Sequence, residues 1–264
     1  MYISSLVARC DVRRLYLMVA IVILGVVFVP TAPHAQWKTP WSYAGKDGPS
    51  QWANLDPAYA ACNGKEQSPI DIRNSVKADL PVLRFEFKSG PLNIINNGYT
   101  AVRVDYAPGN GNVVTVSDKR YELTQFHFHH PSEEQIHGKP YDMVIHFMLK
   151  GSDGKVAGVA ILVKAGEANA TVGELWKYMP RMAGKDHVIP GVEIDPEGLV
   201  PRDTAYYTYA GSVTAPPCTE GVTWFVLKTP VTVSHQQIDA FAKLYPHDVR
   251  PPQPLDGRIV KESE

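Results

Sequence analysis

Short stretches in which apolar and polar residues alternate recur along this chain and limit the folds open to it. Residues 83–88 and 102–106 alternate strictly, and 121–129 is another alternating stretch. A period of two is that of a strand with one buried face. Residues 143–149 and 156–163 are continuous apolar runs, which predicts strands buried on both faces. We therefore expect a mainly β protein.

The composition agrees with a single globular domain rich in turns. The 20 glycines and 22 prolines are spread along the chain, which is typical of many short strands joined by turns. A net charge of −1 argues against a nucleic-acid binder. The architecture expected is a large, mostly antiparallel sheet with short peripheral helices.

Three short helices are predicted at the edges of this sheet. Asp56 followed by Pro57 is typical of a helix start. Thr171 with Glu174, and Ser234 with Gln237, have the spacing of capping boxes. Prolines 180 and 246 then end the second and third helices.

Residues 1–35 are predicted to be a signal peptide. Arg13 and Arg14 precede an uncharged apolar run at 15–29, and small, turn-forming residues follow at 30–35. The arginine pair also has some likeness to a twin-arginine signal. An uncleaved anchor is the alternative, but a spanning helix needs about 20 apolar residues. Cleavage after Ala35 leaves residues 36–264 as one exported domain, periplasmic or secreted, with no stable membrane anchor.

Export determines which cysteines remain in the mature chain and favours their oxidation to a disulfide. Cys10 is removed with the signal peptide, so Cys62 and Cys218 remain. An even pair in an exported protein indicates one disulfide. Two buried free thiols are the alternative.

Candidate metal ligands lie at the end of the alternating stretch 121–129. Because residues two apart on a strand share a face, His127 and His129 present two imidazoles side by side, with Gln125 on the same face. The chain turns near residues 137–140 and returns through 143–149, where a hairpin can bring His146 opposite that pair. Three imidazoles with an open fourth position form a catalytic zinc site. Ordinary core or surface histidines are the alternative, to which we assign those at positions 34, 137, 187, 235 and 247. His130 is expected to point to the opposite face of the strand.

The run Gln125–Phe–His–Phe–His129 followed by Pro–Ser–Glu133 resembles the alpha-class carbonic anhydrases, particularly bacterial secreted ones. Further similar motifs are Trp–Ser–Tyr at 41–43, Gln–Ser–Pro–Ile–Asp at 67–71, Gly–Ser–Val–Thr–Ala–Pro–Pro–Cys at 211–218, Val–Thr–Trp at 222–224 and Arg–Pro–Pro–Gln–Pro–Leu at 250–255. The resemblance covers nearly all of the mature chain. It implies a central sheet of about ten strands and a Zn²⁺ ion held by His127, His129 and His146.

The resemblance also implies roles for other residues. Thr214 corresponds to the hydroxyl that accepts a hydrogen bond from the zinc-bound hydroxide, and Glu133 to the carboxylate that accepts from Thr214. Gln125 corresponds to the acceptor that fixes the His127 tautomer. The residues corresponding to the carbon dioxide site are Val213, Thr214, Ala215, Val222, Trp224 and Met148, and the disulfide of secreted members corresponds to Cys62 and Cys218.

Three positions depart from the family pattern. Tyr99, or Thr100 beside it, stands where active members often have a proton-shuttle histidine. Val144 replaces the glutamate that usually bonds the third histidine, and we hypothesise that Glu134 takes over that bond. Gly158 stands in place of a pocket valine, so either the apolar pocket is wider or a neighbour such as Met148 fills the space.

The function expected is reversible hydration of carbon dioxide to bicarbonate and a proton by zinc-bound hydroxide. The alternatives are a non-catalytic binding domain of the same family, a zinc hydrolase of small esters and a periplasmic zinc store. The expected partners are carbon dioxide and bicarbonate, with anions or sulfonamides as inhibitors. The oligomeric state stays open, with a homodimer as one option.

Overall fold

The computed structural model describes residues 39–98, 102–184 and 187–264. The predicted signal peptide therefore lies outside the described residues. Among the described residues, no helix has the length and apolar character needed to cross a bilayer.

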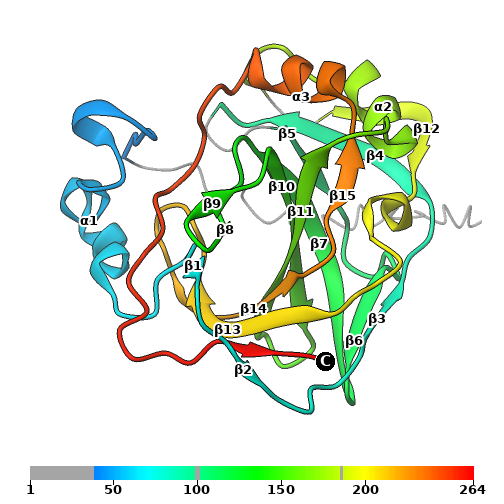
Figure 1. Cartoon of the computed structure of the whole chain (residues 1–264). Helices are drawn as coiled ribbons and strands as arrows, with labels where there is room; N and C mark the ends of the chain where they lie inside the picture. Colours follow the sequence, from blue (N-terminus) through cyan, green and yellow to red (C-terminus); the bar gives the residue numbers. More distant parts are fainter. Residues whose placement is uncertain (1–38, 99–101, 185–186) are drawn as a thin grey trace, which may run out of the picture. The chain divides into compact units, whose positions relative to one another are not determined.

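The main sheet has 13 strands, of which ten follow one another along a continuous path (Figure 1). In spatial order these are β12 (His187–Ile194), β4 (Gly90–Asn96), β5 (Val102–Asp105), β7 (Lys119–His129), β10 (Met143–Gly151), β11 (Val156–Ala165), β14 (Glu220–Leu227), β13 (Tyr206–Ser212), β16 (Lys261–Glu262) and β2 (Val76–Lys77). Three strands pair beside this path: β3 (Leu83–Glu86), β6 (Val113–Val116) and β15 (Val231–Val233). Most pairs are antiparallel, and β11 with β14, β11 with β15 and β16 with β2 are parallel. The predicted mainly β architecture is confirmed.

The two continuous apolar runs form β10 and β11, in the middle of the sheet. Phe147 and Ile145 pack into the core cluster on one face, while Val144 and Met148 pack into a second cluster on the other. Both faces of β10 are thus covered, as the apolar run predicts.

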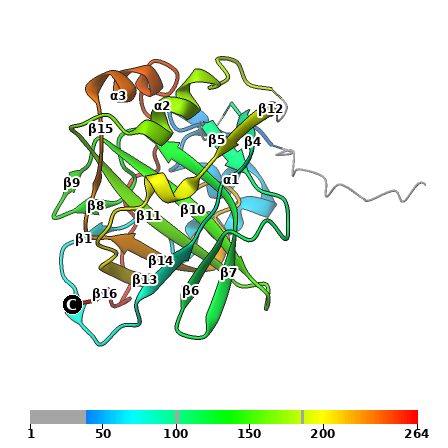
Figure 2. The same ribbon diagram turned by 90° about the vertical axis from the view of Figure 1, so that its right-hand side faces the viewer.

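Strand β7 connects these central strands to the outer part of the sheet. It pairs with β10 on one side and with both β5 and β6 on the other (Figure 2). Its alternation is interrupted at Thr124, where the pairing with β10 shifts register. Leu123 before the shift and Phe126 after it therefore both pack into the core cluster.

Two short strands, β8 (Gln135–Ile136) and β9 (Lys139–Pro140), lie between β7 and β10 in the sequence. They form a small three-stranded sheet with β1 (Asp71–Ile72). His137 and Gly138 both have positive φ at the turn between β8 and β9. The chain thus reverses near residues 137–140, as predicted, although an additional pair of short strands occupies the connection.

The helices are short and peripheral. They are α1 (Trp52–Leu55), α2 (Ala170–Lys177), α3 (His235–Ala242) and the 3₁₀ segments Gly45–Asp47, Pro57–Asn63 and Pro196–Leu199. α2 and α3 lie together at one end of the sheet (Figure 1), where Trp176 donates a hydrogen bond to the Gln237 carbonyl.

The start of the second helix differs from the prediction. Asn169, not Thr171, caps α2, because its side-chain oxygen accepts from the Val172 amide at 3.0 Å. Asparagine is at least as good an N-cap residue as threonine, so the helix begins two residues earlier than predicted. The capping box of Ser234 and Gln237 at α3 is confirmed.

Candidate metal centre

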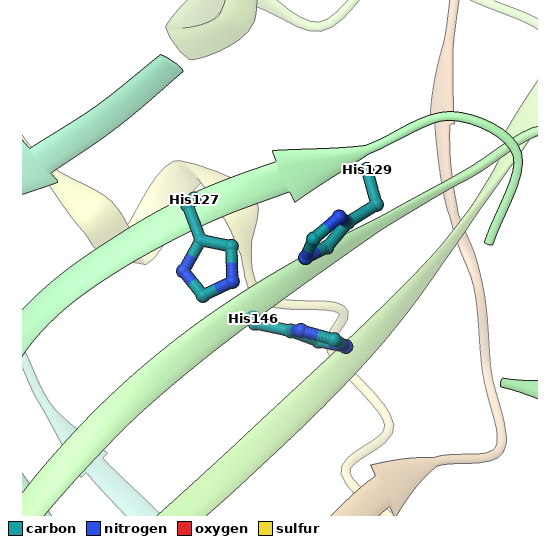
Figure 3. A group of neighbouring side chains, drawn as sticks. All are labelled: His127, His129 and His146. Atoms are coloured by element: carbon teal, nitrogen blue, oxygen red, sulfur yellow. The ribbon is translucent and has the colours of Figure 1, made fainter. Parts of the chain in front are cut away.

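His127 and His129 project from the same face of β7, and His146 projects toward them from β10 (Figure 3). The antiparallel register pairs His146 directly with His127. One ligand nitrogen from each ring lies within 4.8 Å of the others. His129 and His146 are fully buried, and His127 keeps 8% of its surface. The structure therefore brings all three predicted ligands together.

Each ring is fixed by one hydrogen bond. His127 Nδ1 lies 2.8 Å from Gln125 Oε1, and His129 Nδ1 lies 2.7 Å from the carbonyl oxygen of Asp248. His146 Nε2 lies 3.0 Å from both carboxylate oxygens of Glu134. The remaining nitrogens, Nε2 of His127 and His129 and Nδ1 of His146, are left for a metal.

These nitrogens fit a zinc ion. His129 Nε2 and His146 Nδ1 are buried without a hydrogen-bond partner. Buried polar atoms are rarely left unpaired, so such an atom needs an explanation. Three imidazole nitrogens directed at one point are the donor set of a catalytic zinc site with an open position.

The protonation of the rings differs. Burial, followed by the charges of neighbouring histidines, holds the pKa values of His127 and His129 well below the ordinary value, so both rings are in the neutral form that a metal requires. For His146, burial lowers the pKa, but the charge and hydrogen bond of Glu134 outweigh it and the pKa is raised.

Glu134 is completely buried and takes the position of hydrogen-bond partner to His146. Val144, two residues before His146, lies in an apolar cluster instead. The carboxylate thus comes from the segment between β7 and β8, and not from the strand that bears the histidine.

Glu133 lies beside the metal-facing nitrogens of His129 and His146. Its Oε1 accepts from the Arg250 amide at 2.8 Å, and its Oε2 lies 3.5 Å from His129 Nε2 and 3.8 Å from His146 Nδ1. Burial raises the pKa of Glu133 to about 7, with the charge of His146 and hydrogen bonding from Arg250 and Thr214 acting in the opposite direction. The Thr214 hydroxyl is therefore next to this carboxylate, as the resemblance implies.

An apolar wall borders the rings. Its residues belong to the second core cluster, in which Val213 packs against Met148, Val222 and Trp224. The Trp224 ring lies 4.8 Å from the His146 ring, centroid to centroid. Ala215, with 8% of its surface exposed, follows Thr214.

Trp224 also explains Gly158. A Cβ on Gly158 would lie 2.6, 2.7 and 2.9 Å from three atoms of the indole ring. The space that a larger side chain would occupy is thus filled by Trp224, and not by Met148. The glycine permits the tryptophan to lie against the strand, so the smaller residue does not widen the pocket at this point.

The predicted shuttle position, Tyr99, and Thr100 beside it lie outside the described residues. The preceding Asn96 is described and well anchored. Its amide donates to the Pro180 carbonyl at 2.9 Å, and its side-chain oxygen accepts from the Gly98 amide at 3.0 Å.

Sequence reasoning missed the segment Asp248–Arg250. Asp248 fixes His129 through its carbonyl oxygen and accepts from the His130 amide at 2.8 Å through its carboxylate. Neither contact has a signal in the sequence, because both join positions more than 100 residues apart. Arg250 begins the family-like motif at 250–255, and this motif was the one available signal that the residue has a role.

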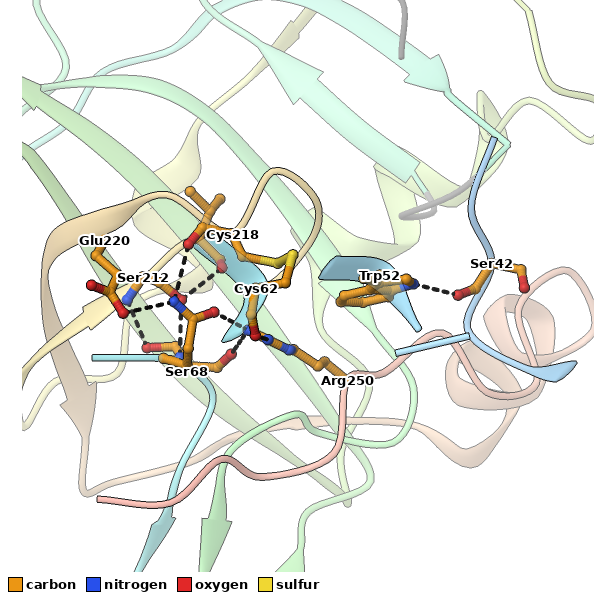
Figure 4. Close-up of a disulfide and its surroundings, with 10 residues drawn as sticks. Ser42, Trp52, Cys62, Ser68, Ser212, Cys218, Glu220 and Arg250 are labelled. Carbon is orange, nitrogen blue, oxygen red and sulfur yellow. Dashed lines mark hydrogen bonds between the residues drawn. A yellow bond between two sulfur atoms is a disulfide. The ribbon is translucent and has the colours of Figure 1, made fainter. Parts of the chain in front are cut away.

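Arg250 also links the metal centre to the predicted disulfide, which is present between Cys62 and Cys218 (Figure 4). The buried guanidinium donates to Gln67 Oε1, to the Ser68 carbonyl and to the Cys62 carbonyl at 2.8–3.0 Å. Gln67 in turn donates to the Cys218 carbonyl at 3.2 Å. The disulfide and the Glu133 side chain are thus held by the same arginine residue.

The comparisons with known proteins agree with this site. The family model of eukaryotic-type carbonic anhydrases matches residues 47–264. A carbonic anhydrase of Neisseria gonorrhoeae is 38% identical over 252 residues, 95% of this chain and 98% of that protein. A dioscorin of Dioscorea japonica is 36% identical over 224 residues, 81% of this chain and 82% of its own. The solved complex of alpha-carbonic anhydrase from Thermovibrio ammonificans with the inhibitor sulfanilamide has a TM-score of 0.80 and 38% identity, covering 86% of this chain and 99% of that one. The chain therefore belongs to the eukaryotic-type, or alpha-class, carbonic anhydrase family.

Proposed function

We propose that this protein catalyses the reversible hydration of carbon dioxide to bicarbonate and a proton, with Zn²⁺ held by His127, His129 and His146. The observation that carries the proposal is the convergence of three nitrogens, two of them buried and unpaired, beside Glu133 and Thr214. The preserved donor set favours the enzyme over a binding domain that has lost its metal.

The residues around the ligands have separate tasks. Zinc would supply Lewis acidity that makes water nucleophilic near neutral pH, an effect for which carbonic anhydrases are the reference example. Glu133 accepts a hydrogen bond from the Thr214 hydroxyl. The Thr214 oxygen is then left as an acceptor that orients the nucleophile. Val213, Val222 and Met148 provide an apolar surface for carbon dioxide.

Three further residues keep the ligands in position. Gln125, the Asp248 carbonyl and Glu134 each hold the ring nitrogen that faces away from the metal. These bonds fix the ring orientation and the tautomer, and so preorganise the site.

The proposal extends to export and inhibition. The apolar run at 15–29, with a disulfide in the described chain, supports a signal peptide and a periplasmic or secreted protein. Since the Thermovibrio relative was solved with sulfanilamide, we propose that this compound and small anions bind at the metal here too. A homodimer is a further option, for which light scattering on the mature chain is the test.

Stopped-flow hydration of carbon dioxide on the zinc-loaded mature chain tests the function. Turnover that disappears after chelation, and in His129→Ala, is expected. Conversion of a small ester without carbon dioxide hydration would favour the hydrolase, and zinc binding with neither activity would favour a binding domain or a zinc store.

A further inference from the structure

An ion pair lies next to the metal ligands on the neighbouring strand. In β5, Arg103 is the cross-strand partner of His127, and Asp105 is the partner of Gln125. Directly opposite residues in an antiparallel pair share a face of the sheet. Val102 and Val104, which alternate with them, are buried in the core on the other face. The pair therefore lies on the face that bears the metal centre.

The pair is held in a fixed geometry and remains partly accessible. Arg103 Nη2 donates to Asp105 Oδ2 at 2.8 Å, and Nε lies 2.7 Å from Oδ1. The exposed fractions of the two side chains are 25% and 16%. A guanidinium has five N–H donors, and Asp105 occupies one edge of it. Nη2 and Nε form that edge, and Nη1 lies outside it.

Of the three ligands, His127 is the one that lies directly opposite this pair. His127 is the one ligand with measurable exposure, 8%, while His129 and His146 have none. The exposed ligand of the set is therefore the one whose direct partner on β5 is Arg103.

We propose that Arg103 is a binding residue for small carboxylate-like oxyanions, bicarbonate above all, at the approach to the metal centre. A planar guanidinium matches a planar carboxylate-type anion in shape and charge. Neutral carbon dioxide lacks the charge that Arg103 recognises, so the residue distinguishes the two sides of the reaction. Asp105 orients the guanidinium and offsets its charge, which keeps the anion from being held too tightly. This inference rests on the proposed function for its natural ligand.

The test is the titration of acetate and bicarbonate into the zinc-loaded mature chain, with both dissociation constants measured by isothermal titration calorimetry. Arg103→Gln should raise both dissociation constants about three- to tenfold, the range for one partly exposed charge-assisted hydrogen bond. Asp105→Asn should lower them, because it removes the offsetting charge. The double variant, Arg103→Gln with Asp105→Asn, keeps the net charge of the native pair. It should still bind the anions more weakly than the native chain, because the contact with Arg103 is lost.

Arg84→Gln, at an exposed arginine of β3, is the matched control and should leave both constants unchanged. Zinc content and sulfanilamide affinity verify that each variant keeps its metal centre. Unchanged anion affinity in Arg103→Gln, or the same loss in Arg84→Gln, would overturn the inference. A native chain that binds acetate through Arg103 but does not hydrate carbon dioxide would overturn the proposed function alone.

Discussion

Both carboxylate oxygens of Glu134 lie 3.0 Å from Nε2 of His146, although the two residues belong to different segments. The partner of this ligand is thus supplied from the connection after β7, while the position two residues before His146 is the apolar Val144. A buried carboxylate therefore bonds His146, although it comes from another segment than the strand that bears the histidine.

Glu134→Gln should weaken zinc binding about 10- to 100-fold, the usual effect of removing the hydrogen-bond partner of a metal ligand. The amide keeps the volume of the side chain but removes its charge. Competition with a chromogenic chelator measures the affinity. Glu167→Gln, at an exposed position, is the control. Equal affinities in the two variants would show that Glu134 has no part in holding the metal.

Zinc affinity should rise with pH through the raised pKa of His146. A proton on this ring competes with zinc, and the charge and hydrogen bond of Glu134 overcome the effect of burial and hold that proton. In the metal-free chain, the stability from the protonated ring is present below its unfolded pKa and is lost as pH rises through the folded one. In Glu134→Gln, burial becomes the main influence on the His146 pKa and lowers it. The pH midpoint of zinc binding should therefore move down. A midpoint that stays in place would contradict this assignment.

Gly158→Val should destabilise the chain by about 1–3 kcal/mol, the range for overpacking a filled core. The added side chain would collide with Trp224, whose ring contacts His146. Urea unfolding measures the change. Gly90→Ala is the control, since the nearest atom to its new Cβ is 3.9 Å away. Equal stabilities of Gly158→Val and the native chain would mean that Trp224 moves without cost.

Removal of the disulfide, as Cys62→Ser with Cys218→Ser, should cost about 2–5 kcal/mol of unfolding free energy. The bond closes a loop between residues 156 positions apart, which restricts the unfolded chain strongly. Denaturant midpoints with and without a reductant measure the effect in the native chain. If the reductant changes the native midpoint and leaves that of the double variant unchanged, the bond is the cause.

Hydration of carbon dioxide should be limited by proton transfer and accelerated by imidazole buffers. The sequence has Tyr99 at the shuttle position, and a tyrosine side chain ordinarily titrates near pH 10, too high to relay protons near neutrality. Tyr99→His should raise turnover in weak buffer and reduce the imidazole effect. Fast turnover of the native chain without imidazole would exclude this limitation.

Local patterns in the sequence were sufficient for the central strands and for part of the site. A period of two puts His127 and His129 on one face whatever the rest of the fold, because side chains alternate along every strand. The uncharged runs at 143–149 and 156–163 require burial on both faces, which only central strands provide. The position of the α2 cap was wrong by two residues because Asn169 and Thr171 are both acceptable caps.

Tertiary structure alone decided the contacts between distant segments. The register that pairs His146 with His127, the Asp248 carbonyl on His129 and the packing of Trp224 on Gly158 all join residues that have no local relation. The same holds for Arg103 beside His127, since alternation gives the face of each strand but not its neighbour. Strand order and register depend on how the whole set of apolar faces packs at once, so the sequence determined which side chains share a face, and the packed sheet determined which of them meet.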